Sequence, residues 1–202
     1  MDVQLMFERF EKYLDVIESK LLNKYFEQQK DYIHCKLGCS FCCESGEYPF
    51  SELEFQYAML GYNSLSEKEK KIIYSHIETT KAEKAESHDQ DFMYRCPFLI
   101  DKKCSIYLHR GLICRTHGLM YFIENENGES RNKGPDCINR KLNYSNVYDP
   151  EKKMISLELW EKTGIEVQPV AYNISQKALL KSDAAKYLEL DFGETKALID
   201  WF

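Results

Sequence analysis

Apolar residues recur near the start of the chain at alternating steps of four and three positions. Residues with this spacing lie on one face of an α-helix. The pattern therefore predicts a long amphipathic helix within residues 1–30, whose apolar face packs on the protein's own core or offers a surface to a protein partner. The positions of this stripe are Val3, Phe7, Phe10, Leu14, Ile17 and Leu21.

Two later segments begin with the serine-to-glutamate spacing of a capping box, in which the two side chains bond the backbone N–H groups at a helix start. Ser51 and Glu54 predict a helix that ends at Gly61, where glycine suits a helix C-terminus. Ser64 and Glu67 predict a longer, highly charged helix that runs to about residue 87. The inward-facing positions of this second helix are expected to be Ile72, Ile73, His76 and Ile77.

The remaining segments predict a mainly α fold. Residues 95–140 have an irregular pattern with short strands at 98–100 and 119–123, and a surface loop at 124–135 contains an Asn127-Gly128 turn. Further helices are expected at 154–160, 175–190 and 194–202. We therefore expect one small helical domain spanning residues 1–202. Its parts are the N-terminal amphipathic helix (1–30), a core of irregular cysteine-bearing metal loops with short strands (35–140), and C-terminal helices (150–202).

Composition limits the functional classes. The chain has 202 residues and a net charge of −6, whereas nucleic-acid-binding proteins carry a basic surface, so no nucleic-acid partner is expected. No run of about eighteen apolar residues predicts a membrane span. The N-terminus also lacks the basic start and apolar run of a signal peptide. We therefore expect a cytoplasmic protein, in which thiols stay reduced.

Eight cysteines dominate the candidate chemistry, and four of them fall within nine residues. An even number could form disulfides and some could be ordinary buried residues, but a reducing compartment favours metal binding. Clustered thiolates select zinc, copper(I) or iron–sulfur clusters. The candidate metal ligands are Cys35, Cys39, Cys42, Cys43, Cys96, Cys104, Cys114 and Cys137.

The spacing of the first cysteines favours a [4Fe–4S] cluster, with Zn²⁺ as the alternative. Cys35, Cys39 and Cys42 could hold three corners of the cluster, and we expect Cys114 to supply the fourth ligand. Radical S-adenosylmethionine enzymes share such a triplet, but the segments that follow here lack their strand–helix alternation. Structural zinc sites often pair two Cys-x2-Cys motifs, and only one is present. Cys43 is adjacent to Cys42, so the two side chains are expected to point in different directions and not to bind the same ion together.

Five motifs in order resemble the YkgJ-type cysteine-cluster family over about residues 35–140. The family is described as a zinc- or iron-chelating domain and is often labelled an iron–sulfur oxidoreductase, so the resemblance implies metal binding without a defined reaction. Gly111 and Met120 stand where the family usually has proline, which alters turn rigidity rather than ligands. A more distant likeness, confined to the cysteines, is to flagellin lysine methylases with an iron–sulfur cluster. The motifs are Cys35-x3-Cys39-x2-Cys42-Cys43, Cys96-Pro-Phe-Leu, Cys104-Ser-Ile-Tyr-x-x-Arg110, Cys114-Arg-Thr-His-Gly-Leu119 and Asp136-Cys137-Ile-Asn139.

Three polar residues near the later cysteines are candidates for supporting the metal or a substrate. Arg115 could donate hydrogen bonds to a cluster sulfide or an anionic substrate, and His117 could act as a ligand or proton donor. Alternatively, both brace their loop through backbone carbonyl groups. Asn139 is expected to support the ligand loops. The sequence thus predicts a metal-binding protein, with an iron–sulfur redox or group-transfer enzyme as the alternative and no indicated substrate.

Overall fold

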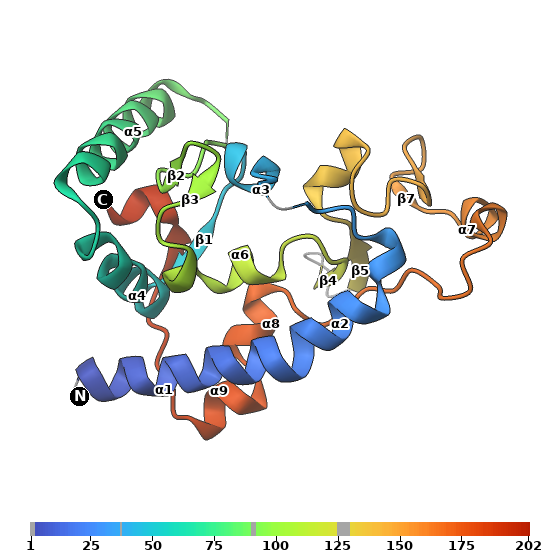
Figure 1. Ribbon diagram of the computed structural model, residues 1–202, viewed down its shortest axis with the longest axis horizontal. Helices are drawn as coiled ribbons and strands as arrows, with labels where there is room; N and C mark the ends of the chain where they lie inside the picture. The colour runs from blue at the N-terminus through green and yellow to red at the C-terminus, as the bar shows by residue number, and fades with distance from the viewer. Residues whose placement is uncertain (1–2, 37, 90–91, 125–129) are drawn as a thin grey trace. The chain divides into compact units, whose positions relative to one another are not determined.

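The computed structural model describes residues 3–36, 38–89, 92–124 and 130–202, and the chain divides into two compact units (Figure 1). Unit 1 comprises Met1–Lys36 and Thr116–Leu190, and unit 2 comprises Leu37–Arg115 and Asp191–Phe202. The cysteine-bearing segment 35–140 is therefore shared between the two units. The single domain expected over residues 1–202 stays a prediction, because two compact units can still fold together as one domain.

The N-terminal helix of unit 1 runs almost without interruption through three segments, α1 (Val3–Val16), the π-helical η1 (Ile17–Leu22) and α2 (Asn23–Gln28) (Figure 1). Phe10, Leu14 and Ile17 of the apolar stripe are buried, whereas Val3 at its start is 59% exposed. The buried positions lie on one face of the helix because the stripe follows the helical period.

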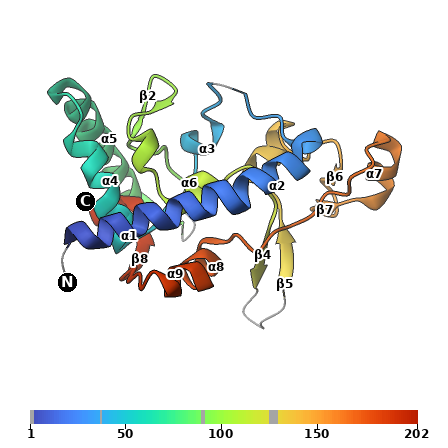
Figure 2. The same cartoon turned by 60° about the horizontal axis from the view of Figure 1, so that its bottom comes forward.

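Two short helices, α8 (Gln176–Leu180) and α9 (Asp183–Tyr187), lie beside this long helix (Figure 2). The hydroxyl of Tyr13 on α1 donates a hydrogen bond to the carbonyl oxygen of Leu179 at 2.7 Å. The prediction of one helix over 175–190 is wrong, because the Ser182 hydroxyl accepts a hydrogen bond from the Ala185 N–H and starts a second helix there.

The rest of unit 1 consists of short strands and helices. The predicted loop at 124–135 is partly a hairpin, since Ser130–Lys133 pairs antiparallel with Tyr121–Glu124; the Asn127-Gly128 turn lies outside the described residues. The helix predicted at 154–160 begins only at Leu157, because Ser156 caps it there. The bounds are η2 (Lys30–Tyr32), β4 (Tyr121–Glu124), β5 (Ser130–Lys133), η4 (Asp136–Arg140), β6 (Tyr148–Asp149), β7 (Met154–Ile155) and α7 (Leu157–Thr163). A buried cluster of this unit is formed by Tyr32, Met120, Ile138, Tyr144 and Val147.

In unit 2, the first predicted capping box is confirmed and its helix, α4 (Glu52–Asn63), starts directly after Ser51. The helix does not end at Gly61, which lies within it. A Cβ atom at this position would lie 2.9 Å from the Cβ of His109. Glycine is therefore required for the close approach of the neighbouring 3₁₀ helix η3 (Tyr107–His109), not for a helix end.

The second long helix of unit 2, α5 (Glu67–Glu86), ends where the sequence predicts but starts differently. Its capping box consists of Ser66 and Glu69, two residues after the predicted pair. Ile73 and Ile77 are buried as expected. His76 is partly buried, and its Nδ1 atom lies 3.1 Å from the Pro97 carbonyl oxygen.

The C-terminal residues of unit 2 form a strand and a 3₁₀ helix rather than the predicted α-helix over 194–202. β8 (Thr195–Ala197) pairs antiparallel with β1 (Pro49–Ser51), and η5 (Leu198–Trp201) follows. The indole N–H of Trp201 donates to the Phe50 carbonyl oxygen at 3.1 Å. Long-range pairing with β1 therefore overrides the local helical pattern. The other elements are α3 (Phe41–Glu44), β2 (Leu99–Ile100), β3 (Lys103–Cys104) and α6 (Leu112–Thr116).

The mainly α fold class is confirmed: helices provide most of the regular structure, and the strands of the described residues form four two-stranded pairs. Within the described chain, none of the helices has the length and apolar character needed to cross a membrane. The core of unit 2 is formed by Tyr48, Phe50, Ala58, Ile73, Ile77, Tyr94, Cys96, Phe98, Leu99, Ile106, Leu198 and Ile199.

Candidate metal centre

Five cysteines of unit 2 lie in one region of its core, and we call them the five-thiol group. Cys96 is a buried member of that core, and Cys43, Cys104 and Cys114 pack against it. Cys42 completes the group, because its Sγ atom lies 3.9 Å from the Sγ atom of Cys43. The five cysteines come from four separate segments of the chain, so the group exists only in the folded unit.

Backbone hydrogen bonds hold the first three of these cysteines together. Cys42 and Cys43 lie on the short helix α3, and the Cys43 carbonyl oxygen accepts a hydrogen bond from the Cys96 N–H at 2.9 Å. Two residues before Cys96, Tyr94 exchanges two backbone hydrogen bonds with Gly46, at 2.9 and 3.0 Å. This bridge fixes the segment after α3 against the segment that carries Cys96.

The other two cysteines are positioned by β3 and α6. Cys104 lies on β3 opposite Leu99 of β2. Cys114 lies on α6, whose first N–H group, that of Leu112, donates to the Glu54 carboxylate at 2.7 Å. A carboxylate at a helix N-terminus stabilises the free N–H groups there. The fully buried Glu54 therefore fixes the start of the helix that presents Cys114.

Four thiols of the five-thiol group have raised pKa values and stay protonated, whereas the pKa of Cys42 is lowered. Burial raises the pKa of Cys96 to about 12 and also raises the pKa values of Cys104 and Cys114. The hydrogen bond between the Cys42 and Cys43 thiols lowers the pKa of Cys42 and raises that of Cys43. Metal binding removes such protons, and the charge of the ion then offsets the cost of the buried thiolates.

Within the described part of the chain, no three cysteine, histidine or carboxylate side chains already have the spacing of ligands around one ion. The five thiols are neighbours whose side chains must turn toward a common centre to bind a metal. Rotation about χ1 moves a cysteine sulfur without moving the backbone. The donor set fits zinc or iron, because soft thiolates are the ligands that both zinc sites and iron–sulfur clusters use.

A buried hydroxyl that the sequence analysis missed also fits a metal centre here. Tyr48 is 7% exposed, belongs to the same core as Cys96, and its hydroxyl has no hydrogen-bond partner among the described residues. An unpaired buried hydroxyl is a free donor for a group bound beside it. Tyr48 lies outside the cysteine motif that ends at Cys43, so only its location in the fold reveals this property.

The structure does not bring the predicted triplet Cys35, Cys39 and Cys42 together within one unit. Cys35 belongs to unit 1 and Cys42 to unit 2, where Cys39 is exposed just before α3. Cys114, the predicted fourth ligand, does lie in the same group as Cys42. The sulfur atoms of Cys42 and Cys43 lie together, so the expectation that they point apart is wrong.

Cys35 is held by Asn143, not by Asn139. The fully buried Asn143 amide donates to the Cys35 sulfur at 3.3 Å and to the Gly118 carbonyl oxygen at 2.9 Å, and its oxygen accepts from the His34 N–H at 2.7 Å. Asn139 is exposed on η4. Cys137, the remaining predicted ligand, is buried on the same 3₁₀ helix in unit 1.

Arg115 and His117 differ in their surroundings. The Arg115 guanidinium donates to the carbonyl oxygens of Arg110 at 3.0 Å and Leu108 at 2.8 Å, which matches the bracing role that the sequence left as an alternative. His117 lies in unit 1, where burial lowers its pKa and its Nε2 atom has no hydrogen-bond partner among the described residues. Arg115 thus braces the loop of unit 2 that holds Arg110, whose charge helps to lower the pKa of Cys42.

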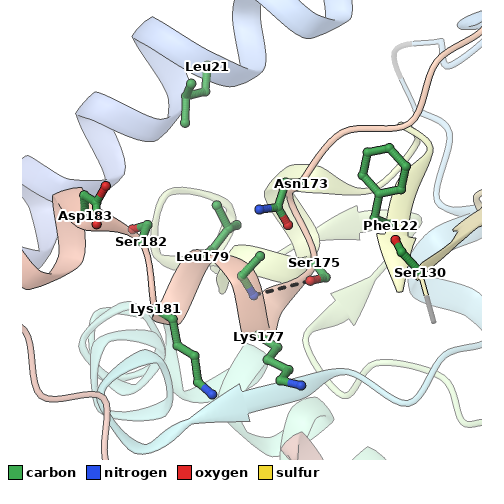
Figure 3. Close-up of a pocket in the computed structure, with 11 residues that line it drawn as sticks. Leu21, Phe122, Ser130, Asn173, Ser175, Lys177, Leu179, Lys181, Ser182 and Asp183 are labelled. Carbon is green, nitrogen blue, oxygen red and sulfur yellow. Dashed lines mark hydrogen bonds between the residues drawn. The ribbon is translucent and has the colours of Figure 1, made fainter. Parts of the chain in front are cut away.

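A cavity of about 760 Å³ lies in unit 1 (Figure 3). Leu21 of the long N-terminal helix, Phe122 of β4 and the start of α9 contribute to its walls. None of its lining residues is a cysteine. These residues are Leu21, Phe122, Ser130, Asn173, Ser175, Lys177, Ala178, Leu179, Lys181, Ser182 and Asp183.

The cysteine-bearing segment of the chain matches a known protein family. Residues 34–138, slightly more than half of the chain and including all eight cysteines, match the CxxCxxCC family, described as "Putative zinc- or iron-chelating domain". The chain belongs to this family. The resemblance inferred from the motifs is thereby confirmed, and metal chelation is the function that the family description supports. No curated protein and no solved structure matches the chain.

Proposed function

We propose that the protein binds one metal centre through the five-thiol group of unit 2 and that this centre organises the unit rather than carrying out a reaction. The observation that carries the proposal is the convergence of Cys42, Cys43, Cys96, Cys104 and Cys114 in one core. Four thiolates complete a tetrahedral site, so the group provides enough ligands without any residue of unit 1.

The spacing of Cys42 and Cys43 favours a single ion. With zinc–sulfur bonds of about 2.3 Å, the sulfur atoms of a tetrahedral site lie about 3.8 Å apart, and these two lie at 3.9 Å. In a [4Fe–4S] cluster each cysteine binds a different iron, which separates the ligand sulfurs more widely. A zinc or iron ion bound by both cysteines is thus our first candidate. The cluster favoured by the sequence is the second, since four of the five cysteines would suffice for it.

A structural role is supported by the surroundings of the group. The Arg115 guanidinium, a candidate donor to a substrate, binds backbone carbonyl groups. The cavity described above is lined by no cysteine. A closed site with protein ligands is typical of structural metal centres. We further propose a cytoplasmic location, where the thiols stay reduced, and retain a partner at the N-terminal helix as a prediction.

The proposal is tested by metal and labile-sulfide analysis of protein purified without oxygen. Zinc or iron at one ion per chain without sulfide would support the single ion, and about four irons with four sulfides per chain would establish the cluster instead. Protein that contains no metal, and binds none when zinc or iron is supplied under reducing conditions, would contradict the proposal.

A matched pair of variants tests the location of the centre. Cys96 and Cys137 are both buried, in unit 2 and unit 1 respectively. We expect Cys96→Ser to lose the metal and Cys137→Ser to retain it. Retention of metal by Cys96→Ser, or equal loss in both variants, would refute the assignment to the five-thiol group.

A further inference from the structure

The hydroxyl of Tyr48 is a buried donor without an acceptor in the described part of the chain. The side chain is 7% exposed, and its oxygen has no hydrogen-bond partner among the described residues. Nearly all buried polar groups in proteins are paired, so an unpaired one calls for a specific explanation. A bound group that accepts the hydrogen bond is one such explanation.

The phenol of Tyr48 is held firmly in place. Tyr48 has a φ of +52°, in the left-handed region that non-glycine residues seldom adopt. A Cβ atom on Gly46 would lie 2.8 Å from the Tyr48 ring and 3.1 Å from its hydroxyl, so the ring rests directly on the glycine backbone. The Tyr94 ring packs against it edge-on, with centroids 5.3 Å apart. An uncommon backbone conformation thus accompanies a hydroxyl that is unpaired among the described residues, a combination that occurs at functional sites.

Tyr48 lies in the same core as thiols of the candidate metal centre. Tyr48 and Cys96 are buried members of the same core, against which Cys43 and Cys114 pack. These three thiols and that of Cys42 interact electrostatically with the phenol. A phenol keeps its proton at neutral pH, so the hydroxyl can only donate toward a thiolate, which has no proton to give.

We propose that Tyr48 donates a hydrogen bond to the sulfur of a metal-bound cysteine of the five-thiol group, an inference that rests on the metal-binding function proposed above. A thiolate bound to a metal still accepts hydrogen bonds, and such a bond reduces the charge density on the sulfur. Groups that bond to metal ligands in this way raise the affinity for the metal and tune the reduction potential of iron centres. Tyr48 is therefore a positioning residue for a ligand rather than a ligand.

The test compares the zinc affinity of wild-type protein and Tyr48→Phe by competition with a chromophoric chelator under reducing conditions. We expect the variant to bind zinc roughly 10- to 100-fold more weakly, as is typical when a partner of a metal ligand is lost. Tyr94→Phe is the matched control. Its hydroxyl donates to the Glu47 carbonyl oxygen at 2.8 Å and accepts from the Ile199 N–H at 3.0 Å, so its loss should lower stability and leave zinc affinity unchanged.

Replacing zinc with cobalt(II) gives a second measurement, the absorption spectrum of the site. This spectrum would not change if Tyr48 only stabilised the fold. Loss of the hydrogen bond should shift the sulfur-to-cobalt charge-transfer band of Tyr48→Phe, while the bands that report tetrahedral geometry stay the same. Unchanged zinc affinity and an unchanged band in Tyr48→Phe, with tight binding by the wild type, would overturn this inference alone. Equal weakening in Tyr94→Phe would also overturn it. A wild-type protein that binds no metal would overturn the proposed function and this inference together.

Discussion

The carboxylate of Glu54 accepts a hydrogen bond from the backbone N–H of Leu112, 58 positions later in the chain, at 2.7 Å. The same side chain closes the capping box of α4 with Ser51, accepting from its N–H at 2.9 Å and from its hydroxyl at 2.7 Å. One fully buried carboxylate therefore stabilises the starts of two helices, α4 and α6. Since α6 carries Cys114, this contact joins the fold of unit 2 to its candidate metal centre.

The first prediction concerns Glu54→Gln, with Glu69→Gln as its control. In this variant an amide N–H₂ group replaces one of the two carboxylate oxygens, which accept from Ser51 and from the Leu112 N–H. A buried N–H or hydroxyl donor then has no acceptor. We expect the free energy of unfolding to fall by about 2–4 kcal/mol. Glu69 closes the exposed capping box of α5, and its replacement should cost about 1 kcal/mol or less. Denaturant unfolding of both variants checks the difference, and equal effects would disprove the bridging role of Glu54.

The second prediction compares two asparagines of unit 1. Asn143→Ala removes a buried side chain that joins His34, Cys35 and Gly118, so the partly buried His34 N–H and the buried Gly118 carbonyl oxygen lose this partner. We expect the free energy of unfolding to fall by about 1–3 kcal/mol. The exposed Asn139, which the sequence analysis selected, should tolerate alanine with almost no change. Thermal unfolding of the two variants measures this contrast, and a larger effect at Asn139 would show that its motif position matters more than burial.

The metal content of Asn143→Ala shows whether Asn143 affects only the stability of the protein or also its metal binding. Because the five-thiol group lies in unit 2, Asn143→Ala should still bind metal with wild-type stoichiometry. Loss of metal in this variant would indicate that Cys35, which Asn143 contacts, belongs to the centre.

The third prediction is that metal binding releases protons and weakens as the pH falls. Burial raises the pKa of Cys96 to about 12 and raises those of Cys104 and Cys114, so these thiols are protonated at neutral pH. Each one that binds a metal as a thiolate must lose its proton. Affinity should therefore rise with pH throughout the range below these pKa values.

Titration calorimetry in buffers of different ionisation enthalpy measures the number of protons released. We expect about three per metal at pH 7 from thiols with raised pKa values, and up to four if a further ligand is also protonated. Carboxylate or neutral histidine ligands would release few protons. A release near zero, or an affinity independent of pH between 6 and 8, would rule out ligation by these cysteines.

Much of the local structure could be predicted because it depends on neighbours in the sequence. The capping box of Ser51 and Glu54 involves residues three apart, and the apolar stripe of the N-terminal helix repeats within each turn. Errors arose where a distant partner competes with the local pattern. Gly61 stays inside α4 because it faces His109, and residues 195–197 form a strand because β1 pairs with them.

The sequence by itself determined the family and the thiolate chemistry, because eight cysteines at these spacings, within one matched segment, are specific without any knowledge of the fold. Only the tertiary structure decided which cysteines are neighbours. The packing of Cys43, Cys96, Cys104 and Cys114 in one core, which also contains Tyr48, brings together residues far apart in the chain. Such contacts follow from how the core of unit 2 is packed, and spacing along the sequence carries no information about them.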